Sequence, residues 1–216
     1  MNRKPIDYSL YLVTDRGLSR GRPTPEIVHA AVRGGVTCVQ LREKACPTRE
    51  FIAEALAVRD FLKSRGIPLI INDRVDVALA VGADGVHLGQ GDLPLATARA
   101  ILGGSKIIGV SAESIRDAIE AESGGADYLG VSPIFATPTK TDTAAPLGLE
   151  GLRAIRREVK LPLVAIGGLT AGNAAAVIGD GADGVAVVSA IVSAEDPERA
   201  ARELARHIAQ ARRTCV

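Results

Sequence analysis

Short apolar runs alternate with longer amphipathic stretches along the whole chain. Each run is too short and too continuously apolar for a strand with one face in water, and it is typical of a buried parallel strand. The stretches between the runs predict helices, with Thr24 before Pro25, Thr48, and Asp196 before Pro197 as N-terminal signals. We therefore expect eight strands, each followed by a helix, with the strands at residues 9–14, 36–41, 68–71, 84–88, 106–110, 127–131, 162–166 and 184–188.

A glycine followed by a small or aliphatic residue precedes every second predicted strand. The motif occurs as Gly34-Gly35-Val36, Gly82-Ala83-Asp84, Gly125-Ala126-Asp127 and Gly181-Ala182-Asp183. The glycine can end a helix in a left-handed turn, and the small residue lets the next strand start close by. A turn repeated at every second strand indicates four similar quarters. This favours a closed (β/α)8 TIM barrel of the α/β class over a doubly wound open sheet.

Length and composition limit the classes of protein. The 216 residues suffice for one barrel, and no Pro- or Ser-rich linker divides them, so we expect a single domain over residues 1–216. The 26 Lys and Arg residues nearly balance the 25 Asp and Glu residues, and Trp is absent. This balance argues against nucleic acid or an anionic membrane as partner. Small molecules are the expected partners, and the sequence is compatible with either a monomer or a homo-oligomer.

The cysteines and the N-terminus indicate a compartment. Cys38, Cys46 and Cys215 are odd in number and lack the spacing of a metal site, so we expect free thiols in a reducing cytosol. The polar segment from Met1 to Asp7 has no long apolar run behind it. We therefore expect no signal peptide, no membrane span and a cytoplasmic protein.

Unusual polar residues and glycines follow the predicted strands at one end only. Because the carboxyl ends of barrel strands share one face, these residues should converge on one mouth, where barrel enzymes carry their chemistry. In strand order they are Gln40, Arg42, Glu43 and Lys44; Asn72 and Asp73; His87 and Gln90 to Asp92; Ser111; Ser132 and Thr137 to Lys140; Gly167 and Gly168; and Val188 and Ser189.

Two aspartates at this mouth have two interpretations. Asp73 and Asp92 each precede a predicted helix and could serve only as its N-cap. They also follow neighbouring strands, facing Arg42 and Lys44. Two such carboxylates suit a Mg²⁺ ion that is held by protein oxygens and by substrate phosphates.

Other mouth residues also have a plain structural explanation beside a functional one. Gln40, Arg42 and Lys44 alternate and so share one face of an extended segment, which is either a solvated strand end or part of an anion site. His87 on an apolar strand favours a hydrogen-bonded packing residue over a catalyst. Gly167-Gly168 is either a tight turn or a loop whose backbone N–H groups hold a phosphate.

Four motifs occur together at the predicted mouth: Gln40-Leu41-Arg42-Glu43-Lys44, the stretch from Asn72-Asp73 through His87-Leu88-Gly89-Gln90-Gly91-Asp92, Pro133-Ile134-Phe135-Ala136-Thr137-Pro138-Thr139-Lys140, and Ala165-Ile166-Gly167-Gly168. In this combination the chain resembles the thiamin-phosphate synthase family from Tyr11 to Ile191. The resemblance implies a transferase of thiamine biosynthesis. Such an enzyme joins 4-amino-2-methyl-5-(diphosphooxymethyl)pyrimidine to 4-methyl-5-(2-phosphooxyethyl)thiazole, or to its 2-carboxy form, and releases pyrophosphate.

The same resemblance implies a role for many of the mouth residues. It places Arg42, Ser111 and Lys140 in catalysis and Mg²⁺ on Asp73 and Asp92. Glu113 departs from the family pattern, in which a histidine often follows the strand that ends at Ser111. The implied ligands of the pyrimidine diphosphate are Gln40, Leu41, Arg42, Glu43, Lys44, Asn72, Ser111 and Lys140. Those of the thiazole phosphate are Thr137, Pro138, Thr139, Gly168, Val188 and Ser189.

The implied chemistry needs no protein nucleophile, because the pyrimidine's own amino group can push electrons as pyrophosphate departs. Two alternatives share the fold: a thiazole tautomerase, which would not need the metal–diphosphate residues, and a non-catalytic sensor of a phosphorylated ligand. The connection from about Pro133 to Leu147 is long and poor in apolar residues. We expect it to act as a lid that ligands order, with a rigid loop on the barrel rim as the alternative.

Overall fold

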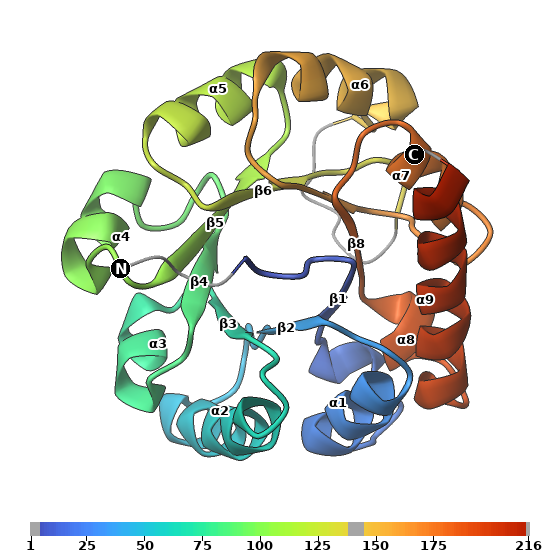
Figure 1. The fold of residues 1–216 in the computed structure, drawn as a ribbon. Coiled ribbons are helices and arrows are strands. Elements are labelled where there is room, and N and C mark those ends of the chain that lie inside the picture. The colour runs from blue at the N-terminus through green and yellow to red at the C-terminus, as the bar shows by residue number, and fades with distance from the viewer. Residues whose placement is uncertain (1–4, 138–144, 215–216) are drawn as a thin grey trace.

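The computed structural model describes residues 5–137 and 145–214. Eight parallel strands pair in chain order and close into a barrel, with β1 paired to both β2 and β8 (Figure 1). This confirms the predicted (β/α)8 barrel and excludes the open sheet. The strands are β1 (Leu10–Val13), β2 (Cys38–Leu41), β3 (Leu69–Asn72), β4 (Gly85–Leu88), β5 (Ile107–Ala112), β6 (Tyr128–Val131), β7 (Leu163–Ile166) and β8 (Gly184–Val187).

Helices surround the barrel and follow the strands in turn (Figure 1). A short 3₁₀ helix precedes α1, and two helices follow β8. The helical elements are η1 (Arg16–Leu18), α1 (Thr24–Arg33), α2 (Thr48–Lys63), α3 (Val75–Val81), α4 (Leu95–Leu102), α5 (Ile115–Ser123), α6 (Gly148–Glu158), α7 (Ala174–Gly179), α8 (Ser189–Val192) and α9 (Pro197–Thr214).

The predicted N-caps are correct for one helix and wrong for two. The carboxylate of Asp196 accepts a hydrogen bond from the backbone N–H of Arg199 at 2.9 Å, as expected at the start of α9. Thr24 and Thr48 are instead the first residues of α1 and α2, and neither helix has a side-chain cap. A proline before each threonine holds extended backbone and takes the cap position, so each helix begins one residue earlier than predicted.

The repeated glycines have the predicted backbone conformation. Gly35, Gly82, Gly125 and Gly181 have φ angles of 106°, 65°, 84° and 100°. Each lies three residues before the start of an even-numbered strand. The repeat is therefore a set of left-handed turns that return the chain from a helix to the barrel.

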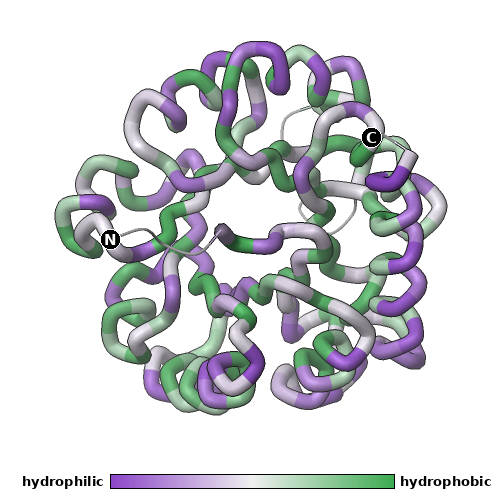
Figure 2. Tube along the Cα trace, viewed as in Figure 1, coloured by the Kyte–Doolittle hydropathy of each residue, from purple (hydrophilic) through white to green (hydrophobic). Residues whose placement is uncertain are grey.

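Apolar side chains form two separate layers. Most pack between the outer side of the barrel and the helices, and Figure 2 shows hydrophilic residues recurring around the outer turns of those helices. A smaller cluster fills the barrel itself, and it includes Tyr8, Tyr11 and Tyr128, the three tyrosines of the chain. Because side chains fill the interior, no open channel runs through the barrel, and a ligand is expected to bind at one of its two ends.

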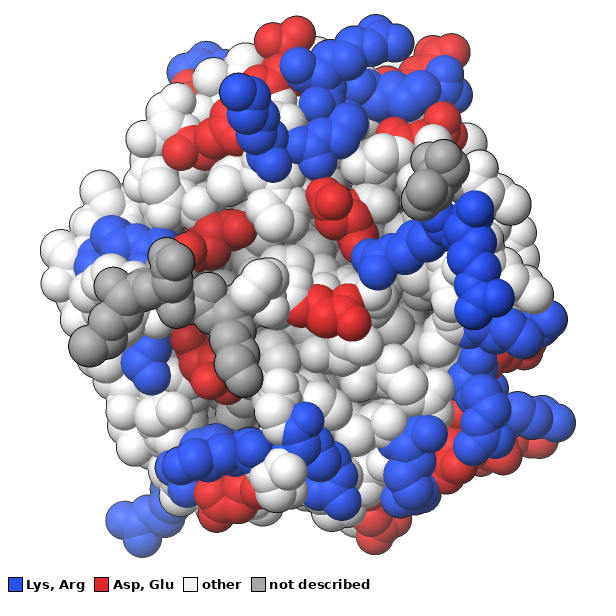
Figure 3. Space-filling view, viewed as in Figure 1, with Lys and Arg blue, Asp and Glu red and all other residues white. Residues whose placement is uncertain are grey.

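The end that carries the strand N-termini is seen in Figure 3, where Arg side chains of α9 follow one side with acidic side chains between them. In the part of the chain that the structure describes, no helix combines the length and the apolar character needed to cross a membrane. Cys38 and Cys46 are free thiols, as expected, while Cys215 lies outside the described residues.

Gly109 provides the space that the Tyr128 ring occupies. A Cβ atom on Gly109 would lie 2.1 Å from Cζ of Tyr128, inside a filled barrel. We expect Gly109→Ala to lower the free energy of unfolding by about 1–3 kcal/mol, because the ring cannot move without displacing its neighbours. Urea unfolding measures this loss. Gly104→Ala is the control, since nothing lies within 4 Å of its added Cβ, and an equal loss in both variants would contradict the steric explanation.

Candidate functional site

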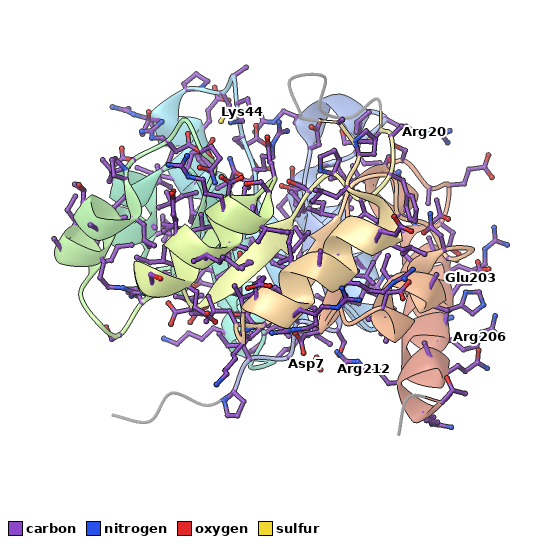
Figure 4. The ribbon with its side chains drawn as sticks, turned by 90° about the horizontal axis from the view of Figure 1, so that it is seen from above. Asp7, Arg20, Lys44, Glu203, Arg206 and Arg212 are labelled. Atoms are coloured by element: carbon purple, nitrogen blue, oxygen red, sulfur yellow. The ribbon has the colours of Figure 1, made fainter. Side chains whose placement is uncertain are left out.

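A cavity of about 370 Å³ opens where the strands end. Lys44, which lines it, lies at the end of the barrel opposite Asp7 and Arg212 (Figure 4). The cavity therefore lies at the mouth where the sequence predicted the chemistry. The predicted residues that line it are Gln40, Arg42, Lys44, Asn72, Asp73, His87, Asp92, Ser111, Ser132, Thr137, Gly167, Gly168, Val188 and Ser189.

The end of β2 divides its side chains between the cavity and the surrounding layer. Gln40, Arg42 and Lys44 line the cavity, as their alternation predicted. Leu41 is fully buried in the outer apolar layer, and Glu43 is directed to Arg16 instead of the cavity. The structure thus brings neither Leu41 nor Glu43 to the predicted substrate site, because adjacent residues of an extended strand point to opposite sides.

Glu43 is a buried carboxylate with an incomplete set of partners. Its side chain is 4% exposed, one oxygen lies 3.4 Å from Nε of Arg16, and the other has no hydrogen-bond partner among the described residues. Burial, followed by the charge of Glu54, raises the pKa of Glu43, and Arg16 and a hydrogen bond from Cys46 only partly offset the rise. The charged form is therefore disfavoured in the folded protein.

A raised pKa in the folded state gives a definite pH dependence of stability. The protonated carboxyl stabilises the fold at low pH, and this contribution is lost as pH rises from the ordinary glutamate pKa through the raised one. Relative to Glu43→Gln, the native protein should therefore lose unfolding free energy over this range, measured by urea unfolding between about pH 4 and pH 7. Glu50→Gln is the control, because Glu50 lies 3.7 Å from Arg16 but is 61% exposed. A constant difference between native protein and Glu43→Gln would contradict the effect.

Asp73 and Asp92 form a carboxylate pair at the cavity wall. Asp73 accepts a hydrogen bond from Nζ of Lys44 at 2.5 Å, and Asp92 accepts one from the backbone N–H of Gly89 at 2.7 Å. Burial, followed by a hydrogen bond with Asp73 and the charge of Asp73, raises the pKa of Asp92. The two carboxyl groups are therefore in contact, although the chain reaches them from two different strands.

The capping interpretation of these aspartates is wrong. The cap positions of α3 and α4 are taken by Arg74 and Pro94, without a side-chain hydrogen bond in either helix. Asp73 instead adopts a left-handed backbone conformation with φ of 60°, which a non-glycine residue rarely adopts. Among the described residues no group of three or more His, Cys, Asp and Glu is suited to a metal ion, so a cation here would rely on this pair and on substrate oxygens.

A chain of hydrogen bonds runs from the barrel interior to Ser111. Nε2 of Gln40 donates to the Tyr11 hydroxyl at 3.1 Å, and the hydroxyls of Tyr11 and Tyr128 lie 2.8 Å apart. Nδ1 of His87 lies 2.9 Å from the Tyr128 hydroxyl, and its Nε2 lies 3.0 Å from Oγ of Ser111. His87 is thus a hydrogen-bonded residue, as expected, and it also lines the cavity.

Two tyrosines of this chain were not predicted as site residues. Tyr11 and Tyr128 line the cavity and hold Gln40 and His87. Strand alternation could have indicated Tyr11, because it lies on the same side of β1 as the inward-facing Val13. No pattern along the sequence pairs Tyr11 with Tyr128, 117 residues later.

Asn72 contributes an unpaired donor. The residue is 7% exposed, lines the cavity, and its amide nitrogen is buried without a hydrogen-bond partner among the described residues. A buried N–H group without a partner costs about 1–3 kcal/mol, so an acceptor atom of a ligand would be favourable at this position.

The side of the cavity opposite the ends of β2 to β4 is formed largely by the backbone after β7 and β8. Gly167 and Gly168 have φ angles of 104° and 65°, and Val188 and Ser189 lie where β8 passes into α8. A Cβ atom on Gly168 would lie 2.7 Å from the carbonyl oxygen of Ala136. Glycine is therefore required here both by the turn and by the approach of the loop after β6. Thr137 lines the cavity, whereas residues 138–144 of the expected lid, including Pro138, Thr139 and Lys140, lie outside the described residues.

The fold and mouth together are typical of a barrel enzyme that acts on phosphorylated small molecules, with carboxylates and cations on one side of the cavity and glycine backbone on the other. A family model described as "Thiamine monophosphate synthase" matches residues 10–191. Thiamine-phosphate synthase of Chloroflexus aurantiacus is 59% identical over 199 residues, which cover 92% of each chain. That of Moorella thermoacetica is 52% identical over 205 residues, covering 95% of this chain and 98% of the relative.

A solved structure shows the same relationship. Thiamine phosphate pyrophosphorylase from Pyrococcus furiosus superimposes with a TM-score of 0.88 at 43% identity, covering 95% of this chain and 97% of that chain. The chain belongs to the thiamine monophosphate synthase family, and it is a transferase of thiamine biosynthesis.

Proposed function

We propose that this protein joins the pyrimidine diphosphate to the thiazole phosphate at the barrel mouth, with the two substrates on opposite sides of one cavity. The observation that supports this most is the division of the cavity wall. Asp73, Asp92, Arg42 and Lys44 lie on the side formed by β2 to β4, and the glycine loop after β7 lies on the other. Two separate anion sites suit a reaction between two phosphorylated substrates.

The first side suits the diphosphate. Arg42 and Lys44 carry positive charge into the cavity, and Asn72 offers its unpaired amide. Gln40 and Ser111 lie on the hydrogen-bond chain above the tyrosines, where they can orient the pyrimidine ring by its polar edge. The family resemblance adds Lys140, which lies outside the described residues.

The carboxylate pair fits a Mg²⁺ ion. Two carboxyl groups in contact repel one another when both are ionised, and Lys44, which donates a hydrogen bond to Asp73, offsets this repulsion only in part, since the pKa of Asp92 stays raised. Asp73 and Asp92 would hold the ion with hard oxygen ligands and leave its other positions to the diphosphate. When bound, Mg²⁺ would neutralise charge that develops on the leaving pyrophosphate.

The second side suits the thiazole phosphate. Gly167 and Gly168 expose backbone to the cavity, and Thr137, Val188 and Ser189 line the same region. The loops after the seventh and eighth strands are a frequent phosphate site in barrels. A thiazole phosphate fixed here would hold its ring nitrogen against the pyrimidine's methylene carbon and so lower the entropic cost of their encounter.

One carbon–oxygen bond breaks and one carbon–nitrogen bond forms. Pyrophosphate leaves with the bonding electron pair, and electrons from the pyrimidine's amino group stabilise the methylene cation until the thiazole nitrogen supplies a new pair. The task of Arg42, Lys44 and Lys140 is to stabilise the departing charge. This division explains why the cavity needs no protein nucleophile.

The two alternative functions, a thiazole tautomerase and a sensor, would each need only one side of the cavity. A thiazole tautomerase would need the second side but not the carboxylate pair with its cations. A sensor of a phosphorylated ligand would need only one anion site, whereas the proposed reaction assigns an anion to each of two sides of the cavity.

Release of pyrophosphate tests the proposal directly. The purified protein should release pyrophosphate and form thiamin phosphate only when both substrates and Mg²⁺ are present. Thiamin phosphate is detected separately, since pyrophosphate alone could come from hydrolysis. Release without the thiazole substrate, or no product with all three components, would contradict the proposed reaction.

A further inference from the structure

Asp15, the residue after the end of β1 and Thr14, holds the guanidinium group of Arg42. Its Oδ2 accepts a hydrogen bond from Nη1 of Arg42 at 2.7 Å, and the two side chains are only 18% and 23% exposed. Arg42 lines the cavity, whereas Asp15 does not. The carboxylate therefore contacts Arg42 from outside the substrate site.

The same carboxylate is itself fixed by backbone. Oδ1 of Asp15 accepts a hydrogen bond from the N–H of Leu18 at 3.2 Å, which caps η1. Oγ1 of Thr14 accepts one from the backbone N–H of Arg42 at 3.0 Å. Both the backbone and the side chain of Arg42 are thus held by two consecutive residues that follow β1.

The loop that carries Asp15 is anchored at its far end. Nη2 of Arg22 donates to the carbonyl oxygens of Val192 and Ala194, each at 2.8 Å, and Oγ of Ser193 donates to the carbonyl of Leu18 at 3.1 Å. The loop therefore rests on the segment that follows α8. An anchored carboxylate can fix the direction of a long arginine side chain that would otherwise sample many rotamers.

From this geometry we propose that Asp15 is a positioning residue for the pyrimidine diphosphate, acting through Arg42. An arginine has five N–H donors, and Asp15 occupies only one of them at Nη1. The remaining N–H donors of Arg42 can then face the diphosphate, because the bond to Asp15 fixes the orientation of the guanidinium group. A charge-assisted bond of this kind restricts the guanidinium more than a neutral one would. The inference rests on the proposed function, because it assigns Arg42 to the diphosphate.

Two substitutions of Asp15 show whether it acts by positioning Arg42 or only through its own negative charge. Asp15→Ala removes the bond and should lower kcat/KM for the pyrimidine diphosphate about 10- to 100-fold, the range expected for hydrogen bonds to charged groups. Its KM for the thiazole phosphate should stay within about 2-fold of the native value. Asp15→Asn keeps an acceptor oxygen and should recover part of the loss. If Asp15 acted only by repelling the diphosphate, both variants would bind it more tightly than the native enzyme.

A double-mutant cycle shows whether Asp15 acts through Arg42. Once Arg42→Ala has removed the guanidinium, adding Asp15→Ala should cost little more. An equal loss in the two backgrounds, or an equal rise in KM for both substrates, would overturn the proposal. If the native enzyme releases pyrophosphate while Asp15→Ala is unaffected, the inference fails and the proposed function stands. If the native enzyme forms no product, the proposed function itself fails.

Asp127 provides a matched control for stability. It pairs with Arg99 at the same 2.7 Å, the two side chains are 23% and 24% exposed, and the carboxylate also accepts a backbone N–H bond, from Ile108. This pair lies outside the cavity, at the start of β6. Asp127→Ala should lower the Tm without raising the KM for the diphosphate. A rise in that KM matching the rise in Asp15→Ala would show that general loosening of the fold, and not the position of Arg42, caused both.

Discussion

Loss of either carboxylate from the Asp73–Asp92 pair should reduce turnover on the order of 10²-fold or more. The reason is that the Mg²⁺ ion proposed to bind this pair would no longer be held where it neutralises the charge on the departing pyrophosphate. Binding of the diphosphate should weaken in parallel, and excess Mg²⁺ should restore part of the activity. The effect is expected to be the largest of any single side chain in the cavity, since the two groups contact one another and act together.

The choice of substitution matters at Asp73. Its left-handed backbone makes alanine a source of strain as well as of charge loss. Asp73→Asn removes the charge and keeps a residue that tolerates this conformation, so it should impair turnover about as much as Asp73→Ala. Asp92→Asn and Asp92→Ala complete the set.

Steady-state rates at several Mg²⁺ concentrations, with an EDTA control, measure the effect. Asp76→Ala is the matched control, because this carboxylate lies three residues further along, is 63% exposed and pairs with Arg74 outside the cavity. It should retain near-native activity. If the Asp73 and Asp92 variants also kept near-native rates in EDTA, the pair would have no metal role.

Gly168→Val should raise the KM for the thiazole phosphate by on the order of 10²-fold, with little change in affinity for the pyrimidine diphosphate. The added Cβ would lie 2.7 Å from the carbonyl oxygen of Ala136 and 2.8 Å from Cβ of Phe135, at a φ of 65° that a β-branched residue resists. The loop must therefore move away from the position in which its backbone can approach a phosphate.

Separate titration of the two substrates tests this division of the cavity. Gly172→Ala is the control in the same connection, since its added Cβ meets only a side-chain oxygen at 3.7 Å. Circular dichroism confirms that Gly168→Val remains folded. Equal increases in KM for both substrates would show that the two sides of the cavity are not independent.

The sequence by itself determined the barrel and the end of it that carries the site. Apolar runs, helical spacing and glycine turns act between residues close in the chain, so their effect does not depend on distant packing. Strand alternation likewise placed Gln40, Arg42 and Lys44 in the cavity. Even the one-residue displacement of α1 and α2 is local, since it comes from Pro23 and Pro47.

Tertiary structure decided which side chains meet. Asp15 reaches Arg42 across 27 residues, Tyr11 reaches Tyr128 across 117, and Asp73 contacts Asp92 from a neighbouring strand. These contacts depend on the register of parallel strands and on closure of the barrel, which no short-range pattern encodes. Strand alternation alone turns Glu43 away from the cavity that Arg42 and Lys44 line, but its contact with Arg16 is a tertiary one.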